Sequence, residues 1–99
     1  MKYKSISLPN GKLSVGGSVT YINCNIILLY FNHSTSPDSA HIGCGVIPAV
    51  TGGYNPQFAV VTFGNSVKTI RFQRSTNYGF KYMEASDNTM AIYEFICCI

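Results

Sequence analysis

Hydrophobic and polar residues alternate along most of this chain in short runs, which is the pattern of β-strands. No stretch repeats its apolar residues at the three-to-four-residue spacing of an amphipathic helix. Clusters of Gly, Pro, Asn, Asp and Ser separate the runs and are typical of turns. The expected strands cover residues 4–8, 13–15, 19–31, 40–47, 58–63, 67–73, 78–84 and 89–98.

The run at 19–31 is the longest of these and is predicted to form one strand. Its first half alternates, which places Ile22, Cys24 and Ile26 on one face. Its second half, 27–31, is apolar on both faces. Such a strand is expected to be covered on both sides, either between two layers of one domain or between the core and a neighbouring subunit.

Two further strands carry specific packing predictions. Gly43 and Gly45 share one face of their strand, so we expect another part of the chain to pack closely against them. In the last strand the alternation places Tyr93 on the same face as Phe95 and Ile92 on the opposite face.

Strands at this spacing predict an all-β fold: a small antiparallel jelly roll, β-sandwich or barrel of about eight strands. The 99 residues are expected to form one domain, 1–99, that is the C-terminal head of a longer fibre protein or stands alone. A domain of this size is marginally stable by itself and gains from oligomerisation.

Composition narrows the classes of function. Hydrophobic residues make up 46% of the chain and charged residues 11%, which excludes a disordered chain and argues against a helical bundle. The net charge of +3 is spread along the sequence, so no nucleic-acid partner is expected. No run of 18 apolar residues occurs, and no apolar segment follows Lys2 and Lys4, so neither membrane insertion nor a secretory signal is expected.

Nothing in the sequence predicts an enzyme, a metal or a cofactor. Cys44 as nucleophile and His41 as base would form the one local catalytic pair, but they fall on opposite faces of an expected strand and are not expected to meet. Asp38 and Asp87 have the surroundings of turn residues, which leaves few carboxylates for glycoside hydrolysis. The four cysteines do not complete a zinc pattern with the two histidines. We expect free thiols, with a Cys24–Cys44 bridge as the alternative.

From Gly16 onward, a glycine turn leads into a long strand, a polar loop, a strand ending at Ile47-Pro48 and then a Gly-Tyr-Asn-Pro turn at 53–56. This order of features resembles the C-terminal head domains of phage tail-fibre and baseplate receptor-binding proteins. That family carries an LP-x-GYRP turn at this point. This chain has Ile47 in place of Leu, five residues between Pro48 and Tyr54, Asn55 where Arg is usual, and no Trp.

The resemblance implies a homotrimer in the virion tail, assembled in the host cytoplasm, whose heads adhere to a host cell-surface polysaccharide. Two alternatives remain open: a structural trimerisation or tail-tip module without a ligand, and a stand-alone lectin-like domain that binds carbohydrate.

Saccharide binding requires aromatic faces and hydrogen-bonding side chains on exposed loops or at subunit seams. Each candidate also has a structural interpretation: Tyr54 packs on its own loop, Asn77 forms a turn, Arg74 is a solvated edge charge and Tyr78 belongs to the core. His41 faces the two glycines of its strand, where a subunit contact competes with a ligand. The candidate ligand-binding residues are Asp38, His41, Tyr54, Asn55, Arg74, Asn77 and Tyr78.

Overall fold

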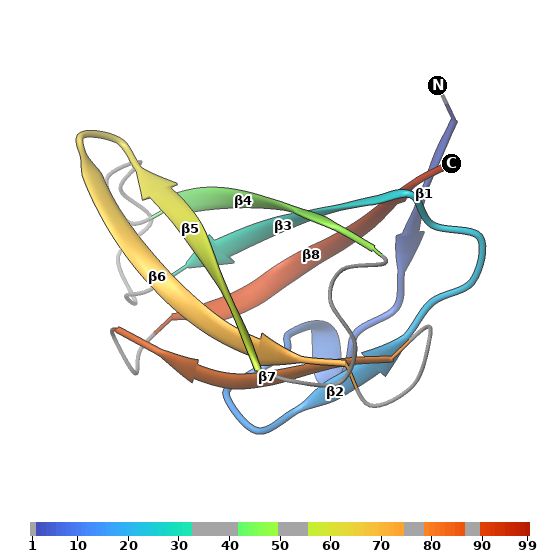
Figure 1. Ribbon diagram of the computed structural model, residues 1–99, viewed down its shortest axis with the longest axis horizontal. Helices are drawn as coiled ribbons and strands as arrows, with labels where there is room; N and C mark the ends of the chain where they lie inside the picture. Colours follow the sequence, from blue (N-terminus) through green and yellow to red (C-terminus); the bar gives the residue numbers. More distant parts are fainter. Residues whose placement is uncertain (1, 33–41, 50–55, 75–78, 87–89) are drawn as a thin grey trace.

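The computed structural model describes residues 2–32, 42–49, 56–74, 79–86 and 90–99. These residues form one antiparallel sheet that curls into a half-barrel (Figure 1), which confirms the all-β prediction. A short 3₁₀ turn, η1 (Pro9–Gly11), follows the first strand. The strands are β1 (Tyr3–Ile6), β2 (Ser18–Thr20), β3 (Ile26–Asn32), β4 (Ile42–Pro48), β5 (Gln57–Phe63), β6 (Ser66–Gln73), β7 (Gly79–Ala85) and β8 (Ala91–Cys98).

The order of strands across the sheet is β1-β8-β3-β4-β5-β6-β7-β2. Strands β3 to β7 form a meander, and β8 returns to lie between β1 and β3. The two N-terminal strands therefore form the two edges of the sheet. Between them, the chain crosses the open side of the half-barrel: Leu13 exchanges main-chain hydrogen bonds with Ile92 of β8, and Gly16 and Gly17 bond to Tyr82 of β7.

The prediction of one long strand over 19–31 was wrong. The chain instead forms β2 and β3 on opposite sides of the half-barrel, joined by residues 21–25. Asn23 has a φ of 56°, a left-handed conformation that Asn tolerates and that no strand accommodates. The expected common face is lost as a result, because Ile22 is exposed and Cys24 is buried.

The prediction for the faces of the last strand was also wrong. Tyr30 pairs with Glu94, but the next residue, Phe31, pairs with Ile92, so Tyr93 is an additional residue in β8. This bulge turns Tyr93 outward and places both Ile92 and Phe95 in the core. Alternation along a strand fails at a bulge, because one residue is left outside the ladder.

Aromatic side chains from five strands fill the concave side of the sheet. Phe31 of β3 meets Phe63 and Tyr82 edge to face at ring-centroid distances of 6.5 and 6.2 Å. Phe80 stacks on Phe72 at 5.3 Å and meets Phe95 edge to face at 5.4 Å. Such pairs add about 0.5–1.5 kcal/mol each beyond the burial of their area.

Close packing against the two glycines of β4 is confirmed. A Cβ atom at Gly43 would lie 2.5 Å from the Thr62 carbonyl oxygen and 2.7 Å from two ring atoms of Phe63. At Gly45 the nearest atoms, in Val60, Val61 and Phe31, would lie at 3.3–3.6 Å. The absence of a side chain at position 43 therefore lets β5 and its Phe63 ring lie directly on β4.

The four cysteines are free thiols. Cys24, Cys97 and Cys98 are buried, and Cys44 is exposed on β4. Burial raises the pKa of the Cys97 thiol to about 12, and a hydrogen bond with the Cys24 thiol adds to the shift. Because the thiolate is the reactive form, Cys97 behaves as a small core residue.

Candidate binding surfaces

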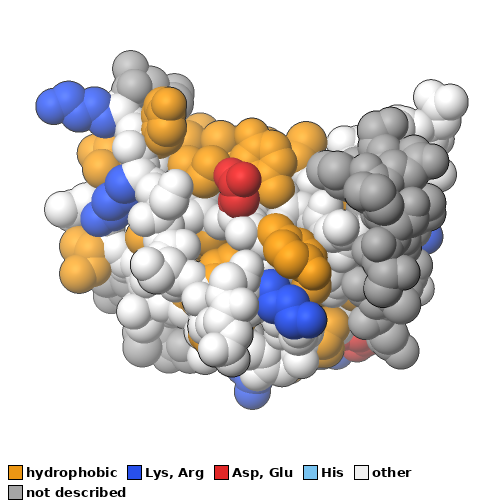
Figure 2. All heavy atoms as spheres, turned by 180° about the vertical axis from the view of Figure 1, so that it is seen from behind, with side chains coloured by type: hydrophobic (Ala, Val, Ile, Leu, Met, Phe, Trp, Pro, Cys, Tyr) orange, Lys and Arg blue, Asp and Glu red, His pale blue; other side chains and the backbone are white. Residues whose placement is uncertain are grey.

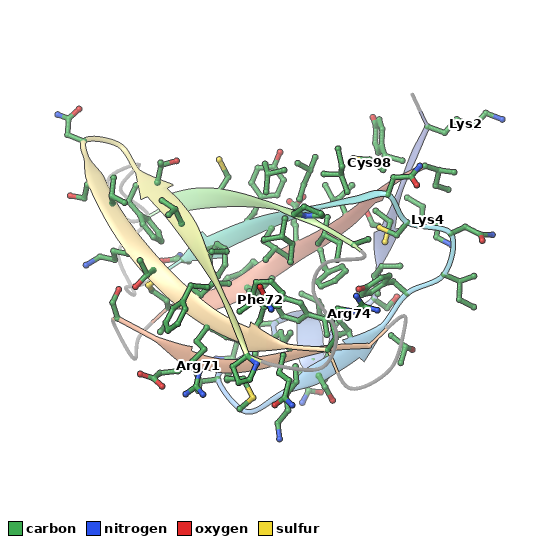
Figure 3. All side chains as sticks on the ribbon, viewed as in Figure 1. Lys2, Lys4, Arg71, Phe72, Arg74 and Cys98 are labelled. Atoms are coloured by element: carbon green, nitrogen blue, oxygen red, sulfur yellow. The ribbon has the colours of Figure 1, made fainter. Side chains whose placement is uncertain are left out.

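Arg74 is the one predicted saccharide-binding residue that the structure describes. It follows β6 directly and is 5% exposed, so it is a buried charge rather than a solvated one (Figure 3). Its role in ligand binding stays a prediction. Asp38, His41, Tyr54, Asn55, Asn77 and Tyr78 lie outside the described residues.

The charge of Arg74 acts on a tyrosine that the sequence patterns did not single out. Tyr21 is buried, and its hydroxyl donates a hydrogen bond to the carbonyl oxygen of Ala49 at 2.6 Å. Burial raises the pKa of Tyr21, and the nearby positive charge of Arg74 partly opposes that rise. The hydrogen bond from Tyr21 to Ala49 joins the irregular segment 21–25 to the residue that follows β4, and so serves the fold.

The convex side of the sheet carries an apolar surface, which we call the outer apolar face. Strands β3, β4, β5 and β8 contribute to it, and hydrophobic side chains gather along this side of the molecule in Figure 2. Four of its side chains are exposed and three are half-buried. In order along the chain, its members are Ile26, Leu28, Tyr30, Val46, Phe58, Val60 and Ile96.

Strand register explains why these side chains adjoin. Leu28 of β3 lies opposite Val46 of β4 on one side and opposite Ile96 of β8 on the other. Cys44 of β4 lies opposite Thr62 of β5, which brings Val60 beside the same row. Phe58 and Val60 are 74% and 56% exposed. Together the seven side chains expose on the order of 500 Å² of apolar surface, near the upper end for the largest patch on a monomer.

A second surface lies where the half-barrel stays open. A groove of about 490 Å³ lies between residues 6–9, which lead from the end of β1 to the start of η1, and residues 18–20 of β2. We call it the seam groove. Ile6, Leu8 and Val19 supply its apolar lining, while Ser7, Ser18 and Thr20 supply polar groups. Its volume falls within the range of small-molecule sites.

Charged groups are sparse on both surfaces. One ion pair joins Arg71 of β6, which lies opposite Phe58, to Glu84 of β7 at 3.4 Å, and it is exposed to solvent. An exposed pair of this kind contributes about 0–1 kcal/mol. Within the described ranges, no three His, Cys, Asp or Glu side chains gather as metal ligands.

Comparison with protein-family models, with curated proteins and with solved structures returns no match. The described part of the chain contains no helix that is long and apolar enough to cross a lipid bilayer.

The sequence patterns predicted neither surface as a binding site, although one pattern indicated the outer apolar face. The apolar residues on both faces of 27–31 pointed to a strand covered from both sides, and β3 contributes to both the core and the outer apolar face. The same two-sided pattern occurs in β5, where Phe58 and Val60 face outward while Val61 and Phe63 face inward.

Proposed function

We propose that this domain is the receptor-binding head of a phage or prophage tail-fibre or baseplate protein, that it works as a homotrimer, and that it adheres to saccharide on the host cell surface. The observation that carries the proposal is the outer apolar face, a surface suited to a neighbouring copy of the chain. The Gly-Tyr-Asn-Pro sequence at 53–56 supports the assignment to fibre heads.

Energetics favour burial of the outer apolar face. Covering about 500 Å² of apolar surface stabilises an assembly by on the order of 12 kcal/mol. Association costs about 4–15 kcal/mol in lost freedom of motion. The free energy gained by burying this face is therefore comparable to the cost of bringing two copies together. A standard interface buries roughly 800 Å² per partner, and the polar margin of the face would supply the rest.

A trimer also suits adhesion. Heterologous contacts that close into a ring give each subunit the same environment, and three identical heads present three identical ligand sites. Binding of the second and third saccharide then occurs at a high effective concentration, so weak individual contacts suffice. Carbohydrate adhesion requires no catalytic group.

Light scattering coupled to size exclusion tests the assembly. We expect a mass about three times that of the chain, and a single-chain mass for Val60→Lys, which places a charge on the β5 side of the outer apolar face, where Val60 is 56% exposed. Val15→Lys is the matched control, because Val15 is also exposed but lies between η1 and β2. A single-chain mass for the unaltered protein, or a trimer that survives Val60→Lys, would contradict the proposed interface.

Retention on host cells or purified cell-wall polysaccharide tests adhesion separately. We expect the unaltered protein to be retained and the single-chain Val60→Lys variant to be retained far less, because avidity is lost. A stable trimer that binds neither cells nor polysaccharide would favour the structural tail-tip module. Binding by a single-chain protein would favour the stand-alone lectin-like domain.

A further inference from the structure

A bulge in β7 turns one acidic side chain toward the convex side of the sheet. Arg71 of β6 lies opposite Glu84 of β7. The next residue of β6, Phe72, lies opposite Tyr82, so Met83 is an additional residue in β7. Tyr82 is buried in the core, and regular alternation would direct the residue two positions further along inward as well. Because of the bulge, Glu84 is exposed instead. Bulges re-aim side chains in this way and are frequent beside functional sites.

Three side chains of different character lie in one row across β5, β6 and β7. Phe58 lies opposite Arg71, and Arg71 lies opposite Glu84. The Phe58 ring is exposed, and the Arg71 Nη1 and Glu84 Oε2 atoms are 3.4 Å apart. Arg71 points away from the interior of the half-barrel, whereas its neighbour Phe72 points inward (Figure 3). An aromatic ring, a group of hydrogen-bond donors and a pair of acceptor oxygens therefore adjoin on the convex side.

A depression of about 150 Å³ opens beside this row, and we call it the β6–β7 depression. Among the described residues, its lining consists of Phe58, residues 69–71 of β6 and residues 84–86, where β7 ends. The Thr69 N–H donates to the Ser86 hydroxyl at 3.2 Å, and the Ser86 N–H donates to the Thr69 carbonyl at 3.0 Å. These two bonds hold the lining segments together. The depression is smaller than the roughly 300–1,000 Å³ of sites for drug-sized ligands, so it suits one small ring.

The lining matches the two sides of a sugar ring. One side of a pyranose presents C–H groups, which pack on an exposed aromatic ring such as that of Phe58. The edge of the pyranose carries neighbouring hydroxyls, each of which donates and accepts hydrogen bonds. The Arg71 guanidinium donates to hydroxyl oxygens, and the Glu84 carboxylate accepts from hydroxyl groups. Two adjacent hydroxyls therefore satisfy both members of the ion pair at once.

Charge indicates that the sugar is neutral. Arg71 and Glu84 carry opposite charges and are the charged residues of the described lining, so its net charge is zero. A phosphate or carboxylate group would be attracted by Arg71 and repelled by Glu84. A purely apolar ligand would cover both charged groups without offering them hydrogen bonds, which is costly. The lining therefore favours an uncharged ring with several hydroxyls.

We propose that the β6–β7 depression is the subsite for one uncharged hexopyranose unit, with Phe58 as the stacking platform and Arg71 and Glu84 as the hydrogen-bonding pair. This inference rests on the proposed function, because it names the place on the domain where the host saccharide is held. The subsite adjoins the outer apolar face at Phe58. Its other groups lie on β6 and β7, which do not contribute to that face.

Amide chemical-shift titration of the whole isotope-labelled protein tests the subsite. The probes are the methyl glycosides of glucose, galactose, mannose and N-acetylglucosamine, and the anionic methyl glycoside of galacturonate is the charged comparison. We expect at least one neutral glycoside to cause saturable shifts in the amides of residues 58, 69–71 and 84–86. We expect the galacturonate glycoside to bind no more tightly than the best neutral one, because the lining has no net charge.

Single substitutions test the individual groups. Phe58→Ala removes the platform and Glu84→Ala removes the acceptor, whereas Val67→Ala alters an exposed residue of β6 outside the lining and is the matched control. We expect Phe58→Ala and Glu84→Ala each to weaken binding about tenfold, the loss that follows from about 50 Å² less apolar contact or from one missing hydrogen bond to a charged group. Val67→Ala, and Phe58→Tyr, which keeps the ring, should bind within about twofold of the unaltered protein.

The amide spectrum of each variant also shows whether it is folded. Glu84 lies outside the outer apolar face, so Glu84→Ala decides the question even if loss of the Phe58 ring alters assembly. Three results would overturn the subsite: no saturable shift with any neutral glycoside, shifts confined to residues outside the lining, or equal binding by Glu84→Ala and Val67→Ala.

Retention on host cells or cell-wall polysaccharide separates this inference from the proposed function. If the unaltered protein and Glu84→Ala are retained equally, the subsite is wrong and adhesion holds. If a methyl glycoside binds at the β6–β7 depression but neither cells nor polysaccharide retain the protein, adhesion is wrong and the subsite holds.

Discussion

Gly43→Ala tests the close packing of β5 against β4. The new Cβ would lie 2.5 Å from the Thr62 carbonyl oxygen and 2.7 Å from the Phe63 ring. Ordinary contact begins near 3.4 Å, so β5 must move by nearly 1 Å. The Thr62 oxygen cannot swing aside as the end of a side chain can, because it belongs to the main chain. The whole strand and the Phe63 ring beneath it must shift.

The cost follows from overpacking and from the strained ladder. Overpacking a well-packed core costs about 1–3 kcal/mol, and a weakened main-chain hydrogen bond costs about 0.5–1.5 kcal/mol. Alanine offsets about 0.4–1 kcal/mol of this by restricting the unfolded chain. These contributions combine to a loss of about 0.5–4 kcal/mol, so we expect Gly43→Ala to lower the free energy of unfolding by about 2 kcal/mol, which corresponds to a fall of about 8–16 °C in Tm for a chain of this size.

Gly45→Ala is the matched control, since Gly45 lies two residues further along the same face of β4. Its Cβ would meet atoms at 3.3–3.6 Å, so the neighbours yield by a few tenths of an ångström. We expect its free energy of unfolding to change by less than about 1 kcal/mol. Urea denaturation followed by tyrosine fluorescence measures both variants. Equal losses in the two variants, or a larger loss at Gly45, would refute the packing argument.

Two further predictions concern buried polar groups. Tyr21→Phe removes the hydrogen bond to Ala49 and leaves that carbonyl buried, so we expect a loss of about 1–3 kcal/mol in urea denaturation, against less than about 0.5 kcal/mol for exposed Tyr93→Phe. The raised pKa of Cys97 makes stability depend on alkaline pH: between its ordinary pKa of 9.0 and about 12, the unfolded thiol releases its proton while the folded one retains it. We expect the free energy of unfolding to fall by up to about 1.4 kcal/mol per pH unit above pH 9, and Cys97→Ala to remove that part of the slope.

Local patterns predicted the strands well because most of them bury only one face. Ile70 and Phe72 in β6, and Phe80 in β7, occupy the core as alternation requires. The prediction failed where a single residue leaves the ladder. Asn23 bends the chain between β2 and β3, and Tyr93 is the additional residue of a bulge. Neither event changes the spacing of apolar residues enough to be recognised from the sequence.

The surfaces differ in how far the sequence could reveal them. The outer apolar face follows from strands that are apolar on both sides, so 27–31 already predicted a covered exterior. The seam groove does not follow from any local pattern, because β1 and β2 border it only through the order of the whole sheet. That order is set by long-range pairing, chiefly the return of β8 between β1 and β3.

Ionic strength tests whether the proposed assembly is held by the outer apolar face. Burial of the outer apolar face is a hydrophobic process, so sulfate and similar salts strengthen it. An assembly held by ion pairs would respond in the opposite way, because salt screens the attraction between charges. In rising sulfate, the trimer mass should therefore persist. If the mass fell as sulfate rose, the assembly would depend on charge, and the assignment of the outer apolar face as the subunit interface would have to be abandoned.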